Sequence, residues 1–186
     1  MASAPWRQRL ISQSDLMTLH EKLKAKDKSI VFTAGSWDLI HAGQCRYLEK
    51  AKTHGDVLVV GVSSNSAIKS VKGPNKPILD EKIRAEMLTF LRSVDFVTIL
   101  PEPSCVPTLG LLKPDTYVTV KEDWTADYKS SKEYATVTSY GGEVIVVDRQ
   151  STSISTTQIL QRAIGGHLSD VLKDFMQYRK EPLKEK

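Results

Sequence analysis

The chain has 186 residues, of which 40% are hydrophobic and 26% charged, and its formal net charge at pH 7 is +4. This length and composition suit one compact domain, and no apolar run reaches the roughly 18–20 residues of a membrane-spanning helix. Two cysteines, Cys45 and Cys105, exclude a disulfide framework. The N-terminus has no secretory h-region, so we expect a cytoplasmic protein that binds no membrane.

Apolar patterns along the chain alternate between strand-like and helix-like periods, which predicts a parallel α/β sheet. A continuous VLVVGV run is typical of a strand covered on both faces. In chain order we predict helix 15–26, strand 29–33, helix 42–53, strand 57–63, a short helix and basic loop 64–77, helix 80–91, strand 96–100, short helix 105–112, strand 115–120, mixed loop and helix 128–140, strand 143–147, a helix from about Thr156 and an amphipathic helix from about His167.

The segment VFTAGSWDLIHAGQCRYL, residues 31–48, carries most of the functional information. A strand runs into a turn of small residues and then into a helix start that holds His41 and Gln44. Backbone N–H groups point outward at such a start, the helix dipole favours negative charge, and glycine allows an anion to approach closely. The segment therefore predicts a phosphate-binding site, in which His41 donates to a phosphate oxygen.

Gln44 lies three residues after His41, on the same side of the first helical turn. Its amide can donate to phosphate but cannot carry positive charge, and charge-assisted hydrogen bonds are about twice as strong as neutral ones. Glutamine at this position indicates an altered lineage, a weakened enzyme or an engineered substitution. Gln44→His should raise the rate more than tenfold if the rest of the site is intact. No gain would mean that Gln44 is natively adapted or that another group is missing.

Three further segments offer phosphate-binding groups, each with a simpler alternative. Lys72, in the basic loop KSVKGPNKP, is predicted to contact phosphate, and a solvated loop is the alternative. Arg84, four residues after Asp80, either reaches substrate phosphate or forms a surface ion pair. In SISTTQIL, the hydroxyls of Ser155, Thr156 and Thr157 stand at a helix start, where ordinary N-capping is the alternative.

The segment VKEDWTADY follows the predicted strand 115–120. Ligands of open parallel sheets lie beyond the carboxyl ends of the strands, which places Lys121, Asp123 and Trp124 at the mouth of the site. Trp124 would stack on a base or line the acceptor pocket; a plain surface cluster is the alternative. Nucleic-acid binding is not expected, because the lysines form no stripe interleaved with aromatic residues.

Taken together, these segments resemble the cytidylyltransferase-like nucleotidyltransferases of the H-x-G-H type over about residues 29–164. Their order is similar to that of the bacterial heptose-1-phosphate adenylyltransferases, whereas the Asp123-Trp124 pair resembles glycerol-3-phosphate cytidylyltransferase. Gln44 stands where the family has its second histidine. The resemblance implies a Rossmann-like, doubly wound parallel sheet in a single domain with a C-terminal helical extension. Residues 1–28 would form a helical segment packed on the core, and residues 165–186 a C-terminal helix and charged tail.

The resemblance also implies a reaction: a phosphate oxygen attacks the α-phosphorus of a nucleoside triphosphate and releases pyrophosphate with Mg²⁺. The acceptor would be a small sugar or polyol phosphate, and the protein a homodimer. ATP is slightly favoured over CTP as the nucleotide, although Trp124 resembles the CTP-using relatives. The alternative is a nucleotide-binding regulatory or scaffold domain that has lost turnover at Gln44. The roles carried over are catalysis for His41, Gln44 and Lys72, substrate binding for Asp38, Arg84 and Trp124, and nucleotide binding for Thr33, Ala34, Gly35, Ser36, Gly43, Lys121, Asp123, Ser155, Thr156 and Thr157.

Overall fold

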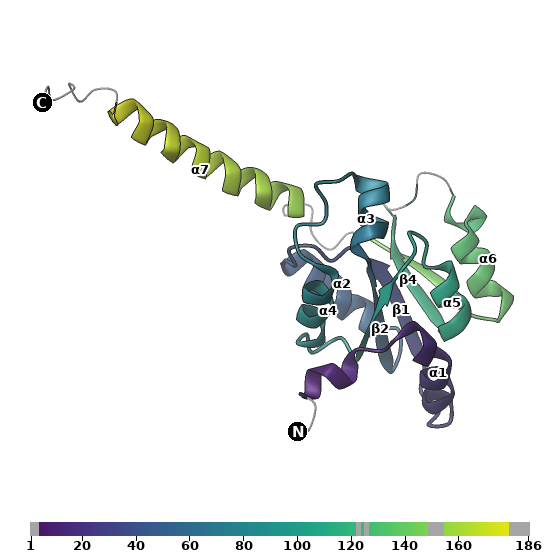
Figure 1. The fold of residues 1–186 in the computed structure, drawn as a ribbon. Helices are drawn as coiled ribbons and strands as arrows, with labels where there is room; N and C mark the ends of the chain where they lie inside the picture. The colour runs from purple at the N-terminus through teal and green to yellow at the C-terminus, as the bar shows by residue number, and fades with distance from the viewer. Residues whose placement is uncertain (1–3, 122–123, 125–126, 149–154, 179–186) are drawn as a thin grey trace, which may run out of the picture. The chain divides into compact units, whose positions relative to one another are not determined.

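The computed structural model describes residues 4–121, 124, 127–148 and 155–178 (Figure 1). The chain divides into two compact units, Met1–Ser151 and Thr152–Lys186. The first unit contains the sheet and its covering helices, and the second contains the helix α7 (Thr156–Tyr178).

The sheet has five parallel strands in the order β3-β2-β1-β4-β5. This confirms the predicted α/β class and the doubly wound arrangement. Three strands have the predicted bounds, while the first continues to Gly35 and the fourth begins at Thr116. The strands are β1 (Ile30–Gly35), β2 (Val57–Ser63), β3 (Phe96–Leu100), β4 (Thr116–Val120) and β5 (Glu143–Val147).

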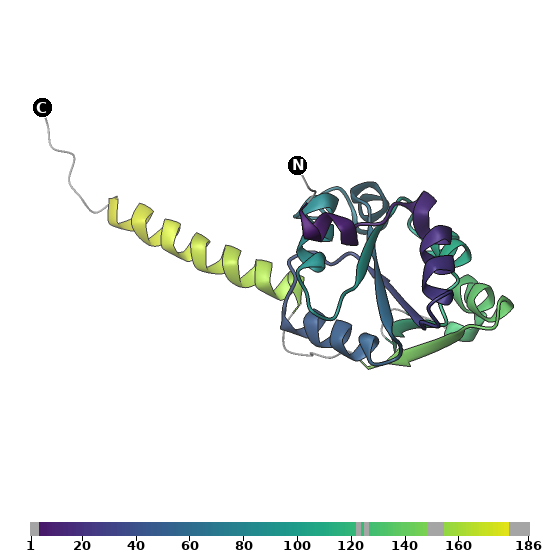
Figure 2. The same ribbon diagram turned by 90° about the horizontal axis from the view of Figure 1, so that it is seen from below.

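Helices cover both faces of the sheet (Figure 2). Successive residues of a strand point to opposite faces. In β1, accordingly, Val31 packs with the buried side chains of α2 and α4, and its neighbours Ile30 and Phe32 pack with those of α1, α5 and α6. The helices of this unit are α1 (Leu16–Lys24), α2 (Ala42–Lys52), α3 (Asn65–Lys72), α4 (Glu81–Thr89), α5 (Val106–Leu112) and α6 (Lys132–Ser139).

The segment before β1 lies against the sheet edge formed by β3. The backbone N–H of Ile11 donates to the carbonyl of Val97 at 2.9 Å, and Leu10 forms an isolated parallel bridge with the same residue. Two short 3-10 turns, Pro5–Arg9 and Gln13–Asp15, precede α1, whose Leu16 is completely buried. The first helix therefore begins one residue later than its sequence pattern predicts.

The strand order places a topological switch between β1 and β4. From β1 the chain adds β2 and β3 on one side, and β4 and β5 lie on the other. A crevice forms beyond the carboxyl ends of the strands at such a point, and it is the usual ligand position in open α/β sheets. The segments after β1 and after β4 both begin at this edge, as the sequence predicted.

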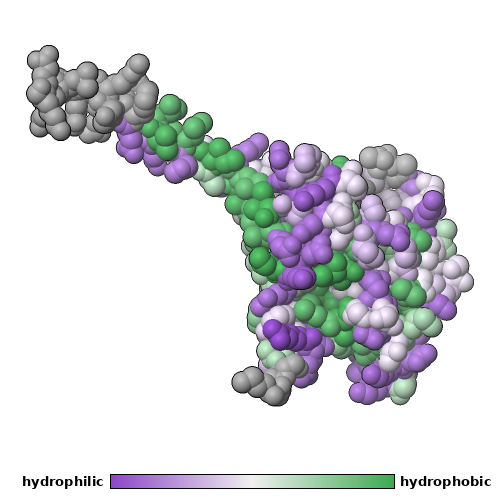
Figure 3. All heavy atoms as spheres, in the orientation of Figure 1, coloured by the Kyte–Doolittle hydropathy of each residue, from purple (hydrophilic) through white to green (hydrophobic). Residues whose placement is uncertain are grey.

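The C-terminal unit differs from expectation in one respect. The sequence suggested one helix from about Thr156 and another from about His167, but α7 is a single helix that continues through Gly165 and Gly166. Apolar side chains, among them Ile164, Leu168 and Val171, gather along one side of this helix (Figure 3). Within the described part of the chain, no helix combines the length and apolarity that crossing a bilayer requires.

Candidate functional site

The turn that links β1 to α2 is built around Trp37. This residue has a φ of 52° and is only 6% exposed, and its indole Nε1 donates to the carbonyl of Gly61 at 2.9 Å. A Cβ atom at Gly35 would lie 3.0 Å from Cε2 of Trp37, so a larger residue at this position would push the indole aside. Burial of the indole thus fixes the path of the turn beneath the candidate site.

Asp38 joins this turn to the loop that precedes α4. The residue is 5% exposed, and its carboxylate accepts two backbone hydrogen bonds, from Ile78 at 2.8 Å and from Leu79 at 3.0 Å. A buried carboxylate must be paired in this way, since an unsatisfied charge is costly inside a protein. The predicted substrate ligand therefore holds two loops together in this structure.

Arg84 makes a second connection between the same loops. Its Nε donates to the carbonyl of Leu79 at 2.9 Å, its Nη1 to the carbonyl of Ser36, and its Nη2 to Oδ1 of Asn65 at 2.9 Å. No part of Arg84 is exposed. Burial lowers the pKa of its guanidinium, and the carboxylates of Asp38, Glu81 and Asp80 oppose that shift. The predicted contact with acceptor phosphate stays a prediction, and the structure gives Arg84 protein partners that explain its burial.

Lys72, at the end of α3, reaches the same turn from the solvent side. Its Nζ lies 3.3 Å from the hydroxyl oxygen of Ser36, and the lysine is exposed. Because an ammonium group attracts anions, this contact places a positive charge at the turn that leads to α2. The predicted contact of Lys72 with phosphate stays a prediction.

The α2 helix begins at this point, with His41 as its N-cap residue and Gly43 buried in the first turn. The Oε1 atom of Gln44 accepts a hydrogen bond from the backbone N–H of His41 at 3.2 Å. The exposed backbone donors of a helix start and its dipole favour an anion. The structure thus shows two contacts in this segment, Lys72 with Ser36 in the turn after β1 and Gln44 with His41 at the start of α2, and the anion site at the helix start stays a prediction.

Thr33 and Tyr47 link β1 to β4 at the topological switch. The Thr33 hydroxyl is 2.7 Å from the Tyr47 hydroxyl, which donates to the carbonyl of Val118 in β4 at 3.0 Å. Thr33 has no exposed surface and bonds to Tyr47 in this structure, and its predicted role in nucleotide binding stays a prediction. Ala34, Gly35 and Ser36 follow it and are partly exposed.

The remaining predicted residues are only partly described. Lys121 is exposed at the end of β4, where the sequence placed it. Trp124 is partly buried and packs against the cluster that contains Phe32 and Tyr117, and its predicted contact with a base or with the acceptor stays a prediction. Asp123 lies outside the described residues. Ser155, Thr156 and Thr157 begin α7 in the second unit, and the Ser155 hydroxyl accepts from the N–H of Gln158 at 3.2 Å as an N-cap.

The described residues do not by themselves form a metal site. Across the described ranges, no three His, Cys, Asp or Glu residues come together in a way that could hold an ion. Asp38, the acidic residue of the β1–α2 turn, already accepts two backbone hydrogen bonds.

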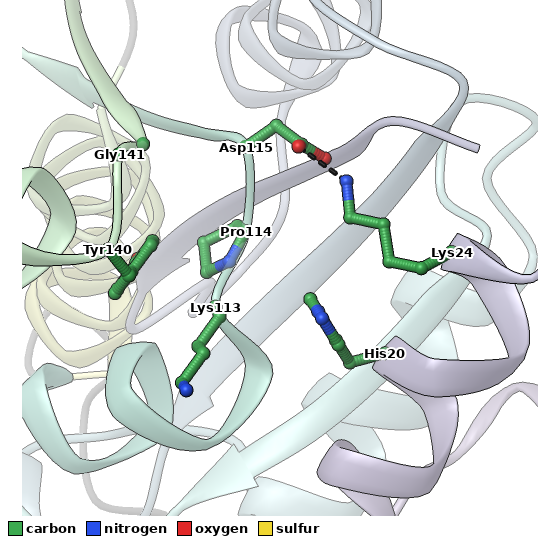
Figure 4. A pocket seen from close by; sticks show the side chains of 8 residues that line it. His20, Lys24, Lys113, Pro114, Asp115, Tyr140 and Gly141 are labelled. Atoms are coloured by element: carbon green, nitrogen blue, oxygen red, sulfur yellow. Dashed lines mark hydrogen bonds and ion pairs between the residues drawn. The ribbon is translucent and has the colours of Figure 1, made fainter. Parts of the chain in front are cut away.

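A separate surface pocket of about 280 Å³ lies at the opposite end of the sheet, where β4 and β5 begin (Figure 4). Lys24 and Asp115 point toward one another across it and form an ion pair of 2.5 Å. His20 Nδ1 is 2.9 Å from the carbonyl of Leu112. These contacts attach α1 to the segment before β4, so the polar residues of this pocket have a structural explanation.

Two supporting residues were not singled out as site residues from the sequence. Asn65 bonds to Arg84 and, through Nδ2, to Asp80 at 2.7 Å, and Tyr47 joins β1 to β4. The signal for Asn65 was its place directly after a strand, at the carboxyl edge where ligands collect. Tyr47 carries no comparable local signal, because its partner Val118 lies 71 residues further along the chain.

Comparisons with known proteins agree with this geometry. A family model described as cytidylyltransferase-like matches residues 32–162. Proteins named bifunctional protein HldE are 39% identical over 150 residues in Pelobacter propionicus, covering 80% of this chain and 30% of that protein, and 44% identical over 124 residues in Campylobacter jejuni subsp. doylei, covering 67% and 25%. The chain thus spans well under half the length of these curated relatives.

Solved structures give the same result for the fold. The lipopolysaccharide core biosynthesis protein from Thermoplasma volcanium GSS1 is 26% identical with a TM-score of 0.54, and the match covers 66% of this chain and 96% of that one. A pantoate-beta-alanine ligase from Francisella tularensis, at 14% identity and a TM-score of 0.50, shares the fold over 95% of this chain and 81% of its own.

Proposed function

The chain belongs to the cytidylyltransferase-like family, and from this premise we propose that it is a nucleotidyltransferase. It would transfer the nucleotidyl group of a nucleoside triphosphate to a small sugar or polyol phosphate. The observation that carries the proposal is the meeting of Lys72 with Ser36 beside the N-terminus of α2, at the switch between β1 and β4. In the proposed function, the Lys72 ammonium, the His41 imidazole and the backbone donors at the start of α2 would bind one polyphosphate.

In the proposed reaction, an oxygen of the acceptor phosphate attacks the α-phosphorus of the nucleotide. The bond from that phosphorus to the bridging oxygen breaks, and pyrophosphate leaves with the electron pair. The nucleophile is already anionic at neutral pH and requires no general base. Catalysis then consists of positioning and charge stabilisation. His41 and Lys72 are proposed to stabilise the charge that develops on the phosphate oxygens.

Mg²⁺ is proposed to enter with the triphosphate. This ion is commonly held by one or two carboxylates together with substrate phosphates, and it keeps several waters. Its chemistry when bound would be neutralisation of phosphate charge. The residues of the chain would donate hydrogen bonds to the phosphate oxygens around the ion.

The nucleotide preference and the assembly are also proposals. We propose ATP ahead of CTP because the KGPNKP loop and the YGGEV strand resemble those of the ATP-using relatives. We propose a homodimer because α7 carries an apolar side that requires cover, with its own sheet as the competing surface. Light scattering on the unaltered chain and on the double variant Leu168→Lys/Leu172→Lys tests the dimer. A dimer held by α7 predicts the mass of two chains for the unaltered protein and of one chain for the double variant.

The function is tested by pyrophosphate release with ATP, CTP, GTP and UTP against a panel of sugar and polyol phosphates. Release that depends on one nucleotide and one acceptor class supports the transferase. Calorimetry with the same nucleotides separates the second candidate, a regulatory nucleotide-binding domain, which would bind tightly without release. A folded protein that neither binds a nucleotide nor releases pyrophosphate would contradict both.

A further inference from the structure

The amide of Gln44 has two ends, and the structure gives each a different environment. Gln44 is the third residue of α2, and its Oε1 accepts the backbone N–H of His41 at 3.2 Å. A glutamine at this position of a helix commonly binds the N-cap N–H in this way. His41 has extended backbone angles, φ −137° and ψ 167°, immediately before the helix. The carbonyl end of Gln44 therefore holds the backbone that carries the imidazole.

The nitrogen end of the amide is available to a ligand. Among the described residues none accepts a hydrogen bond from Nε2, and Nε2 is absent from the set of buried polar atoms without partners. The atom therefore reaches solvent, although the side chain is half-buried. Oxygen and nitrogen share one planar amide, so the bond to His41 also fixes the direction of Nε2 at the helix start.

We infer that Gln44 is an adapted positioning residue: its carbonyl holds His41 and its amide nitrogen is a neutral donor to the nucleotide phosphates. The inference rests on the proposed function, because it requires a phosphate at the start of α2. A protonated histidine has two donors and no acceptor. It would bring charge to the phosphate but could not accept the N–H of His41, whereas glutamine serves both groups at every pH.

Substitutions at Gln44 can test the roles of the carbonyl oxygen and of the amide nitrogen separately. Gln44→Glu keeps the acceptor and replaces the donor with a negative oxygen, while Gln44→Met removes both at similar length. Gln8→Glu is the matched control, since it introduces the same charge on an exposed residue of the first 3-10 turn. The readouts are the thermal midpoint Tm of the free protein and the Kd for ATP from calorimetry.

For Gln44→Met we expect a Tm about 2–4 °C below that of the unaltered chain, the size expected for one lost cap. Gln44→Glu should retain or raise the Tm, since a carboxylate at a helix start is favourable, yet its ATP Kd should rise by about tenfold or more. Gln8→Glu should change neither value. In Gln44→His, acidification below about pH 6.5 should tighten ATP binding and lower the Tm together.

Three results would overturn the inference. Equal Tm values for Gln44→Met and the unaltered chain would show that the carbonyl contact with His41 does not stabilise the helix start. Unchanged ATP affinity in Gln44→Glu would show that the amide nitrogen does not donate to the nucleotide. If Gln44→His left the Tm unaltered and raised turnover more than tenfold, glutamine would be a loss of the second histidine and not an adaptation. Tm and Kd need no turnover, so a chain that binds ATP but releases no pyrophosphate refutes the transfer reaction and leaves the roles of Gln44 standing.

Discussion

The ammonium of Lys72 lies 3.3 Å from the hydroxyl oxygen of Ser36, although the two residues are 36 positions apart in the sequence. One ends α3, and the other lies in the turn after β1. Their contact joins the end of α3 to the turn that leads to the candidate phosphate site. It also offers a direct way to test whether that site binds an anion.

Lys72→Ala should weaken ATP binding by about tenfold or more, because a hydrogen bond to a charged group contributes about 1.5–3 kcal/mol. Calorimetry gives the Kd. The matched control is Lys69→Ala, which removes the same charge from the preceding turn of α3, where the lysine is exposed and has no described contact with Ser36. Equal losses in both variants would indicate a general charge effect and no specific site at Lys72.

Asp38→Asn should lower the free energy of unfolding of the protein. The carboxylate accepts backbone hydrogen bonds on both oxygens, and an amide has only one oxygen to offer. One buried donor is left unsatisfied, at a cost of about 1–3 kcal/mol in the free energy of unfolding. Chemical denaturation measures the loss. Asp27→Asn, at an exposed position, is the control and should leave the unfolding free energy unchanged.

Arg84→Lys should also destabilise the fold, since an ammonium cannot reproduce the planar fork that reaches Leu79, Ser36 and Asn65. We expect a loss on the order of 2–4 kcal/mol, as buried charges lose their partners. Arg92→Lys is the comparison, because the Arg92 side chain is 88% exposed and pairs with Glu49 at the surface. Matching denaturation midpoints for the two variants would contradict the buried role of Arg84.

The stability of the chain should fall in acid partly through Asp115. Burial alone would raise the pKa of this carboxyl, but hydrogen bonds from Lys24 and from the N–H of Ile30 outweigh it and hold the pKa below the ordinary 3.8. A group with a lowered pKa in the folded state stabilises the fold above its unfolded value and ceases to do so as the pH falls through the folded value. Asp115→Asn should therefore lower Tm at pH 7 and converge with the unaltered chain below pH 3.8. A constant difference across that range would refute the assignment.

The two cysteines should differ in reactivity toward an alkylating reagent. Burial raises the pKa of the Cys105 thiol to about 11, and the side chain is 6% exposed. Cys45 is partly exposed in the first turns of α2. Because the thiolate is the reactive form, Cys105 should remain unlabelled at pH 7.5 until the chain unfolds. Mass spectrometry of the native and denatured protein identifies the modified residue, and early labelling at Cys105 would contradict its burial.

The sequence predicted the elements and the edge of the sheet at which the site lies. Strand and helix periodicity are local properties, and so is the passage from β1 through small residues to the helix start at His41. The five parallel strands and the family were identified from those patterns. Lys72 was singled out from its basic loop, and the structure places its Nζ 3.3 Å from the Ser36 hydroxyl in the turn after β1, while its contact with phosphate stays a prediction.

Tertiary structure alone decided what each polar side chain contacts. Spacing indicates on which side of a helix Arg84 lies but not that Ser36, Asn65 and Leu79 surround it, and the same holds for Asp38, whose partners come from a loop 40 residues away. The packing of Trp124 and the continuation of α7 through Gly165 and Gly166 also lay beyond local signals. Burial and hydrogen-bond partners arise from segments that meet only after folding, so a single local pattern determines an element but not its neighbours.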